Sequence, residues 1–398
     1  MKTRFGRVCI VFVFVAFHAV FVSGSATDGV SRPNKDATSG DIRLGVISPI
    51  TGAVPSFGEE VKNGVLLAVQ EWNNRGGIDG RRILAFVEDG QCNAEPAVEA
   101  AERLINQYRV HYLIGEVCSK ASIPVSEITN AAKVIQVTPT STNPSVTVGT
   151  TRAVKPYVFR NCFIDSYQGV ITAKFAYHSL GARTAYVMGD NSNDYVRGIA
   201  ESFTTAFTGL GGIVIGSAYY DGDADSDFSR ILAEIKAARP DIICLPDYYN
   251  VVNLVLKQAR AMGIGVPFIG GDGWDSQDLD LAAAEGSYFS NHFSDKDPRP
   301  EVSLFLDVYD KSFPSAQPVV GIKHMIAALA YDAAYMVFRA IAEAGADDTT
   351  QVAKVLESMD FHGVSGDITF DKSHNPLKTG YMFTVRNRTV QFAARVDP

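Results

Sequence analysis

The chain has 398 residues, of which 46% are hydrophobic and 20% are charged, so it is long enough for two or three domains and apolar enough to fill their cores. This balance excludes a disordered or low-complexity protein. The formal net charge is −8, and an acidic chain with scattered lysine and arginine is a poor candidate for nucleic-acid binding.

The first 26 residues have the pattern of a secretory signal peptide. A basic start at residues 2–7 precedes the apolar run "VCIVFVFVAFHAVFV" at 8–22, and the small residues "SGSA" end it. The alternative is an uncleaved membrane anchor, but this run falls short of the ~20 apolar residues that a spanning helix needs. We therefore expect an exported protein, and removal of the three basic residues of the leader changes the net charge from −8 to −11.

From residue 41 the sequence alternates short apolar strands with amphipathic helices. Apolar strands that carry few polar residues are typical of a parallel sheet with helices on both faces. The expected strands are 42–50, 82–89, 110–115 and 134–139, and the expected helices are 58–77, 94–108 and 123–133.

A second series of the same kind begins near residue 159. Its expected helices are 166–181, 194–212, 228–240 and 250–264, and its expected strands are 184–190, 213–221, 241–249 and 267–274. Beyond about 290 the sequence predicts one long helix at 324–345, a short helix at 350–359 and a strand-rich tail. The predicted fold is α/β, with two doubly wound parallel-sheet lobes.

Hydroxyl side chains follow two strands of the first series. Ser119 lies where a strand ends and a helix begins, so its hydroxyl and the free N–H groups of the first turn are suited to a carboxylate. Thr140, Ser141 and Thr142 offer three more hydroxyls after the next strand. In doubly wound sheets ligands bind outside the carboxyl ends of the strands. Helix capping alone is the alternative explanation for these residues.

Asp272 lies in "GGDGWDS" at a strand end in the second series. A carboxylate there, close to a carboxylate-binding cradle, suits an ammonium group, although Asp-Gly also forms simple turns. Phe57, Tyr195, Tyr248 and Trp274 stand at other strand ends, where they either wall a ligand side chain or pack in the core.

Patterns typical of catalysis or metal binding are missing from the sequence. It has no phosphate loop that ends in Lys-Ser/Thr and no Gly-x-Ser-x-Gly turn, and its seven histidines lack zinc-type spacing. Acidic residues in 223–234 fall at calcium-loop offsets, but Phe228 occupies the position that needs glycine. We expect a protein without a cofactor or metal ion that is not an enzyme.

Export makes a disulfide plausible among the four cysteines beyond the leader. Cys92 and Cys118 each follow a strand, and they leave the same sheet edge within bridging distance if those two strands are parallel neighbours. Cys162 and Cys244 lie in apolar surroundings and are expected to be buried free thiols.

Six blocks of sequence, in order, resemble the periplasmic branched-chain amino-acid (leucine/isoleucine/valine)-binding protein family, the solute-binding proteins of ABC importers with the type I periplasmic binding fold. The resemblance covers residues from about 42 to 395. The blocks are "ISPITGAVPSFGEEVKNGVLLAVQEWNNRGGIDG", "GEVCSKAS", "TPTSTNPSVT", "VFRNCFIDSYQG", "YYNVVNLVLKQARAMG" and "GGDGWDS".

The resemblance implies a disulfide between Cys92 and Cys118 and a site for an amino acid. Ser119 and Thr142 would bind the α-carboxylate of the ligand. The backbone carbonyl of Thr140 would receive the α-ammonium.

The second lobe would complete this implied site. Asp272, where leucine-type members carry Glu, would receive the ammonium together with Thr140. Tyr195 and Tyr248 would close over the ligand, and Phe57 stands where many members carry Tyr.

The family fold implies two lobes joined by three hinge crossings, near 159–161, 291–295 and 371–375. Lobe 1 would comprise 42–159 and 295–371, and lobe 2 would comprise 160–294 and 372–396. We expect a periplasmic monomer that delivers an amino acid to an ABC permease. The alternatives are a ligand sensor of the same fold, which would take amides, urea or aromatic acids, and an enzyme on the same scaffold.

Overall fold

The computed structural model describes residues 40–314, 321–345 and 348–396. All of them belong to one unit of the chain. The predicted signal peptide therefore lies outside the described residues.

The first series of strands forms a five-stranded parallel sheet in the order β2-β1-β3-β4-β5. Its strands are β1 (Ile42–Ser48), β2 (Ile83–Asp89), β3 (Tyr112–Ile114), β4 (Ile135–Thr138) and β5 (Val158–Arg160). All but one of the residues of β1 are buried, because helices cover both faces of the sheet. This agrees with the continuous apolar strands in the sequence.

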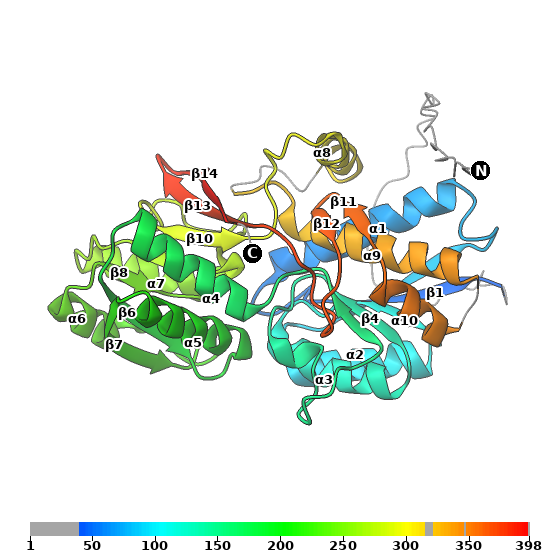
Figure 1. The fold of residues 1–398 in the computed structure, drawn as a ribbon, viewed down its shortest axis with the longest axis horizontal. Helices are drawn as coiled ribbons and strands as arrows, with labels where there is room; N and C mark the ends of the chain where they lie inside the picture. The colour runs from blue at the N-terminus through cyan, green and yellow to red at the C-terminus, as the bar shows by residue number, and fades with distance from the viewer. Residues whose placement is uncertain (1–39, 315–320, 346–347, 397–398) are drawn as a thin grey trace, which may run out of the picture. The chain divides into compact units, whose positions relative to one another are not determined.

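Five helices pack on this sheet. Helices α1 and α9 pack against each other on one face, and α2 and α3 pack together on the other (Figure 1). They are α1 (Pro55–Asn74), α2 (Ala94–Asn106), α3 (Ser119–Ala131), α9 (Met325–Ala344) and α10 (Thr349–Glu357). Gly64 lets α1 approach α9 closely, since a Cβ at this position would lie 2.3 Å from the Ala327 carbonyl oxygen.

The second series forms a seven-stranded sheet in the order β14-β13-β10-β9-β8-β6-β7. Strands β6 to β10 are parallel, whereas β13 and β14 add an antiparallel edge. The strands are β6 (Thr184–Asp190), β7 (Ile213–Tyr220), β8 (Ile242–Cys244), β9 (Phe268–Gly270), β10 (Tyr288–Asn291), β13 (Gly380–Arg386) and β14 (Thr389–Val396).

Helices α4 and α5 pack together against this second sheet, and α6 and α7 also contact each other (Figure 1). Their bounds are α4 (Asp165–Lys174), α5 (Asp194–Gly209), α6 (Ser229–Ala238) and α7 (Tyr249–Ala261). The expected helix 166–181 is not uniform, because a π-helical turn at Phe175–Ser179 follows α4.

Two elements near the C-terminal part differ from the sequence prediction. Helix α8 (Pro300–Ser312) was missed, although Val302, Phe305 and Tyr309 form its buried face. A small hairpin of β11 (Phe361–Gly363) and β12 (Gly366–Ile368) precedes β13. The long helix expected at 324–345 is confirmed as α9. Among the described residues α9 is apolar and long enough to cross a membrane, but 78% of its most apolar window is buried inside the protein, as in a core helix.

The chain passes between the two sheets three times. It leaves the first sheet after β5, returns after β10 to α8 and α9, and enters the second sheet again between β12 and β13. The carboxyl ends of the parallel strands therefore lie near segments that lead to the first sheet and segments that lead to the second sheet.

Candidate ligand-binding site

A small cavity lies among residues from the ends of elements that belong to both sheets. Its volume is about 20 Å³. The lining residues are Phe57, Val117, Thr140, Tyr195, Tyr248, Asp272, Gly273, Met325 and Ile326. Five of these were predicted as site residues from the sequence.

The disulfide between Cys92 and Cys118 is confirmed, with a Cα–Cα distance of 5.3 Å. The strands before the two cysteines are not neighbours, because β1 lies between β2 and β3. The bridge therefore joins two loops that meet beyond the end of β1. Because Cys118 immediately precedes α3, the bridge fixes the place where that helix begins.

Ser119 is buried as the first residue of α3. Its hydroxyl accepts a hydrogen bond from the Asn143 N–H at 3.2 Å, which brings the α3 start next to the "TST" segment. Thr142 Oγ1 is buried and forms no hydrogen bond of normal geometry with a described residue. Ser119 and Thr142 do not line the small cavity itself.

The other two hydroxyls of this segment are used inside the protein. Ser141 Oγ donates to the Val117 carbonyl at 2.8 Å and lies 2.6 Å from Ser122 Oγ, so it braces two loops. Thr140 Oγ1 donates to the Val117 carbonyl at 3.1 Å, and Thr140 also lines the cavity.

Asp272 is held by three side chains. Its Oδ1 accepts hydrogen bonds from Gln168 Nε2 and from the Tyr195 hydroxyl, both at 2.9 Å. Its Oδ2 lies 2.8 Å from Nε2 of the fully buried His292. His292 Nδ1 accepts the N–H of Phe163 at 3.3 Å, so the ring proton is on Nε2 and is donated to Asp272. Burial lowers the pKa of His292, in keeping with a neutral imidazole.

Aromatic rings wall the cavity opposite Thr140. Tyr195 stacks on Tyr248 with ring centroids 4.9 Å apart, and Phe57 meets Tyr248 edge-on at 6.2 Å. Trp274 does not reach this wall. Its indole is fully buried, and Nε1 donates to the Leu245 carbonyl at 2.9 Å.

Direct side-chain contacts join residues that pack with the first sheet to residues that pack with the second sheet. Ser56 Oγ lies 2.9 Å from the Tyr249 hydroxyl and 3.1 Å from Ser276 Oγ. Further along the same boundary, Lys120 Nζ is 2.8 Å from an Asp223 carboxylate oxygen. These contacts show that the cavity is closed over by groups from both sheets.

The family model described as "Periplasmic binding protein" matches residues 41–389. The Leu/Ile/Val-binding protein BraC3 of Rhizobium johnstonii is 30% identical over 325 residues, which are 80% of this chain and 83% of that protein.

The chain belongs to the periplasmic binding protein family. Two solved structures in the same group of binding proteins are similar over their whole length. The leucine-binding protein LivK of Thermotoga maritima has a TM-score of 0.82 and 32% identity, with 90% of this chain and 99% of that chain covered. The isoleucine complex of LivJ from Streptococcus pneumoniae has a TM-score of 0.81 and 30% identity, with 90% and 100% covered. The resemblance and the fold class predicted from the sequence are both confirmed.

The structure of this periplasmic binding protein adds residues that the sequence reasoning missed. Gln168 and His292 bind Asp272, and Met325 and Ile326 at the start of α9 line the cavity. The sequence carries only a weak signal for Gln168 and His292. Each lies next to an apolar stretch, where a buried polar side chain needs a hydrogen-bond partner.

Buried carboxyl groups surround the site of this binding protein. Burial raises the pKa of Glu116 to about 7 and that of Asp165 to about 8. Glu116 Oε2 accepts the Cys118 N–H at 2.7 Å, directly below the disulfide.

Proposed function

We propose that this chain is the extracytoplasmic substrate-binding protein of an ABC importer and that it binds an amino acid, branched-chain or related aliphatic or aromatic. The observation that carries this proposal is Asp272, an acid on the cavity wall whose charge is held by Tyr195, Gln168 and His292. The names of the relatives, which are leucine-, isoleucine- and valine-binding proteins, support the same class of ligand.

The polar groups suit the two ends of a zwitterion. Ser119 and the buried hydroxyl of Thr142, close to the start of α3, would hold the α-carboxylate. Asp272 and the Thr140 carbonyl would receive the α-ammonium. An ammonium suits this place better than a neutral amide, because it complements a carboxylate in both charge and hydrogen bonding.

The rest of the wall is apolar and suits an aliphatic side chain. Phe57, Tyr248, Met325 and Ile326 surround the part of the cavity away from the polar groups. A volume of about 20 Å³ holds little more than one water molecule, so an amino acid needs the two halves to move apart.

The two sheets would then form two lobes that close on the ligand. We place lobe 1 at 42–159 with 295–371 and lobe 2 at 160–294 with 372–396, with hinges near 159–161, 291–295 and 371–375. A ligand that binds both lobes favours the closed form, because neither lobe alone satisfies both of its charges. The contacts of Ser56 and Lys120 with the opposite half support this proposal.

The location and partners follow from the same proposal. A leader at 1–26 would export the protein to the periplasm, where an ABC permease would receive the ligand from the closed form. The protein would act by binding alone, without catalysis and without a cofactor.

Calorimetry of the mature protein with matched ligands tests the proposal. Leucine, isoleucine and valine are compared with 4-methylpentanoate, which lacks the amino group of leucine, and with 3-methylbutylamine, which lacks its carboxylate. We expect at least one amino acid to bind about 100-fold more tightly than its two truncated analogues, since each leaves a buried polar group unpaired. Equal affinity for 4-methylpentanoate, or binding of benzoate, urea or acetamide alone, would favour the alternative sensor of the same fold.

A further inference from the structure

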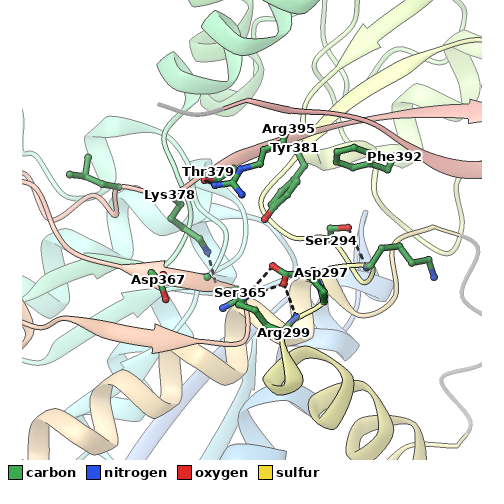
Figure 2. Close-up of a pocket in the computed structure, with 14 residues that line it drawn as sticks. Ser294, Asp297, Arg299, Ser365, Asp367, Lys378, Thr379, Tyr381, Phe392 and Arg395 are labelled. Atoms are coloured by element: carbon green, nitrogen blue, oxygen red, sulfur yellow. Dashed lines mark hydrogen bonds and ion pairs between the residues drawn. The ribbon is translucent and has the colours of Figure 1, made fainter.

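A second, larger cavity lies where the chain passes between the sheets. Its volume is about 720 Å³. It is lined by the segment 294–299 between β10 and α8, by β12, and by residues of β13, of β14 and of the segment that leads into β13. We call it the crossing cavity; Figure 2 shows it. It shares no lining residue with the small cavity described above.

The charge of the crossing cavity is opposite to that of the whole chain. Its lining has four basic and two acidic side chains in a protein whose net charge is −8: Lys296, Arg299, Lys378 and Arg395 against Asp297 and Asp367. Both acids already have cationic or donor partners. Arg299 Nε lies 3.1 Å from both oxygens of Asp297, and His362 Nδ1 lies 2.8 Å from Asp367.

Lys378 is the most deeply buried cation of the lining. It is only 5% exposed, and its Nζ donates to the Asn161 carbonyl at 3.2 Å and to Ser365 Oγ at 3.0 Å. An ammonium has three N–H groups, and no carboxylate of the described residues lies within 4.0 Å of this one. Burial lowers the pKa of Lys378 to about 8, although the charge of the nearby Asp332 carboxylate acts in the opposite direction.

Apolar surface adjoins this ammonium. Leu377 and Phe392 line the cavity and are 58% and 53% exposed, so they offer apolar surface to a ligand. Figure 2 shows Tyr381 reaching from the β13 segment toward Asp297, with Lys378 on one side and Phe392 on the other. The lining thus offers a cation and apolar or aromatic side chains around one volume.

We propose that the crossing cavity binds a small organic anion with an apolar or aromatic body. The anionic group lies against Lys378, and the body lies between Tyr381 and Phe392. Segments of the second and third crossings line the site, and Lys378 also holds the backbone of Asn161 at the first crossing.

The test uses a pair of probes that differ mainly in charge. 1-Anilinonaphthalene-8-sulfonate is titrated by fluorescence into the mature protein saturated with leucine, and N-phenyl-1-naphthylamine is titrated as its neutral analogue. We expect one sulfonate site and at least tenfold weaker binding of the neutral probe. We expect Lys378→Met and Phe392→Ser each to weaken sulfonate binding at least fivefold.

The matched controls are Lys174→Met, at the exposed end of α4, and Leu254→Ser, at a 41% exposed position on α7. Neither residue lines either cavity, so both variants should bind the sulfonate like the unaltered protein. Methionine is uncharged and keeps the length of the buried lysine stem. If Lys378→Met fails to fold, Phe392→Ser and the comparison of the two probes still decide the result.

Three results would overturn the proposal: equal affinity for the two probes, unchanged sulfonate affinity in both folded variants, or displacement of the sulfonate by leucine from protein prepared without it. The last result would place the probe in the amino-acid cavity. A protein that fails to bind any amino acid still permits the probe and variant comparisons, so this proposal and the proposed transport function fail separately.

Discussion

The two sides of the small cavity hold their polar groups by different means. On the side of the first sheet, a disulfide and backbone hydrogen bonds fix Ser119 and the "TST" segment. On the side of the second sheet, Asp272 depends on three side chains, one of which is a buried neutral histidine. The first side is positioned by a covalent bridge and by hydrogen bonds between side-chain hydroxyls and backbone groups, whereas the second is positioned by a network of polar side chains around one carboxylate. The two sides should therefore respond differently to mutation.

The largest expected effect is the loss of the covalent support on the first side. Replacing Cys92 and Cys118 together by alanine should lower the free energy of unfolding by roughly 3–4 kcal/mol, since the bridge closes a loop of 26 residues. Urea denaturation measures this change. Thiol titration of unreduced, denatured mature protein should find two free thiols, from Cys162 and Cys244; four would contradict the disulfide.

The next effect concerns the charge on the second side. Asp272→Ala should weaken amino-acid binding by about 2 kcal/mol or more, because the ammonium would then be buried without its counter-charge. Calorimetry measures the affinity. Asp272→Asn is the matched control for shape, and it should also lose most of the affinity. Unchanged affinity in both variants would remove Asp272 from the site.

His292 tests whether the network, rather than Asp272 alone, is needed. His292→Leu should weaken amino-acid binding by about 1–2 kcal/mol, because one donor to a charged acceptor is lost. His292→Gln, which can still donate, should lose less. 4-Methylpentanoate has no ammonium, so its affinity should be the same for the unaltered protein and both variants. An equal loss of affinity for this analogue and for the amino acid would indicate a merely structural role.

The buried carboxyl groups predict how stability varies with pH. Burial raises the pKa of Glu116 and Asp247 to about 7 and that of Asp165 and Asp275 to about 8. Between pH 6.5 and 8 the folded protein still holds part of these protons, whereas the unfolded chain has already released them, so stability falls as pH rises and levels off above about pH 8. The melting temperature should drop by about 2 °C or more over this range. Glu116→Gln, on the first side, and Asp247→Asn, on the second, should each make the melting temperature depend less steeply on pH. A melting temperature that rises with pH would contradict this account.

The smallest effect is expected for the ion pair that joins the two halves. Lys120 and Asp223 are partly exposed, so their pairing should contribute about 0.2–1 kcal/mol to ligand affinity. A double-mutant cycle of Lys120→Met and Asp223→Asn measures it. The coupling energy should decrease in high salt. A coupling energy that does not change with salt would contradict screening of a partly exposed ion pair.

The sequence predicted the backbone framework better than the side-chain network. Apolar strands, helical periodicity and the polar residues at strand ends were sufficient for the two sheets, and two cysteines after strands of one sheet indicated their bridge. The insertion of β1 between β2 and β3 was not predicted, because strand order depends on packing between distant segments. Helix α8 was missed because its buried face has only three large apolar side chains.

Two site residues show why local sequence was insufficient. Trp274 follows a strand and is aromatic, which favoured a pocket wall, but its indole folds back over Gly270, where a Cβ would lie 2.1 Å from Nε1. His292 lies in a stretch that gives no sign of its partner, since Asp272 is 20 residues away. Both outcomes depend on tertiary contacts that no local pattern encodes.

The position of His292 has a consequence for how movement and recognition are connected. The imidazole stands on the segment that carries the chain from β10 toward α8, and it also binds the backbone of Phe163 just after β5. The imidazole of His292 thus connects two of the three chain crossings between the sheets to the Asp272 carboxylate. In the proposed closure of two lobes, bending of these crossings would shift the imidazole at the acid, so opening would itself loosen the grip on an ammonium and promote its release.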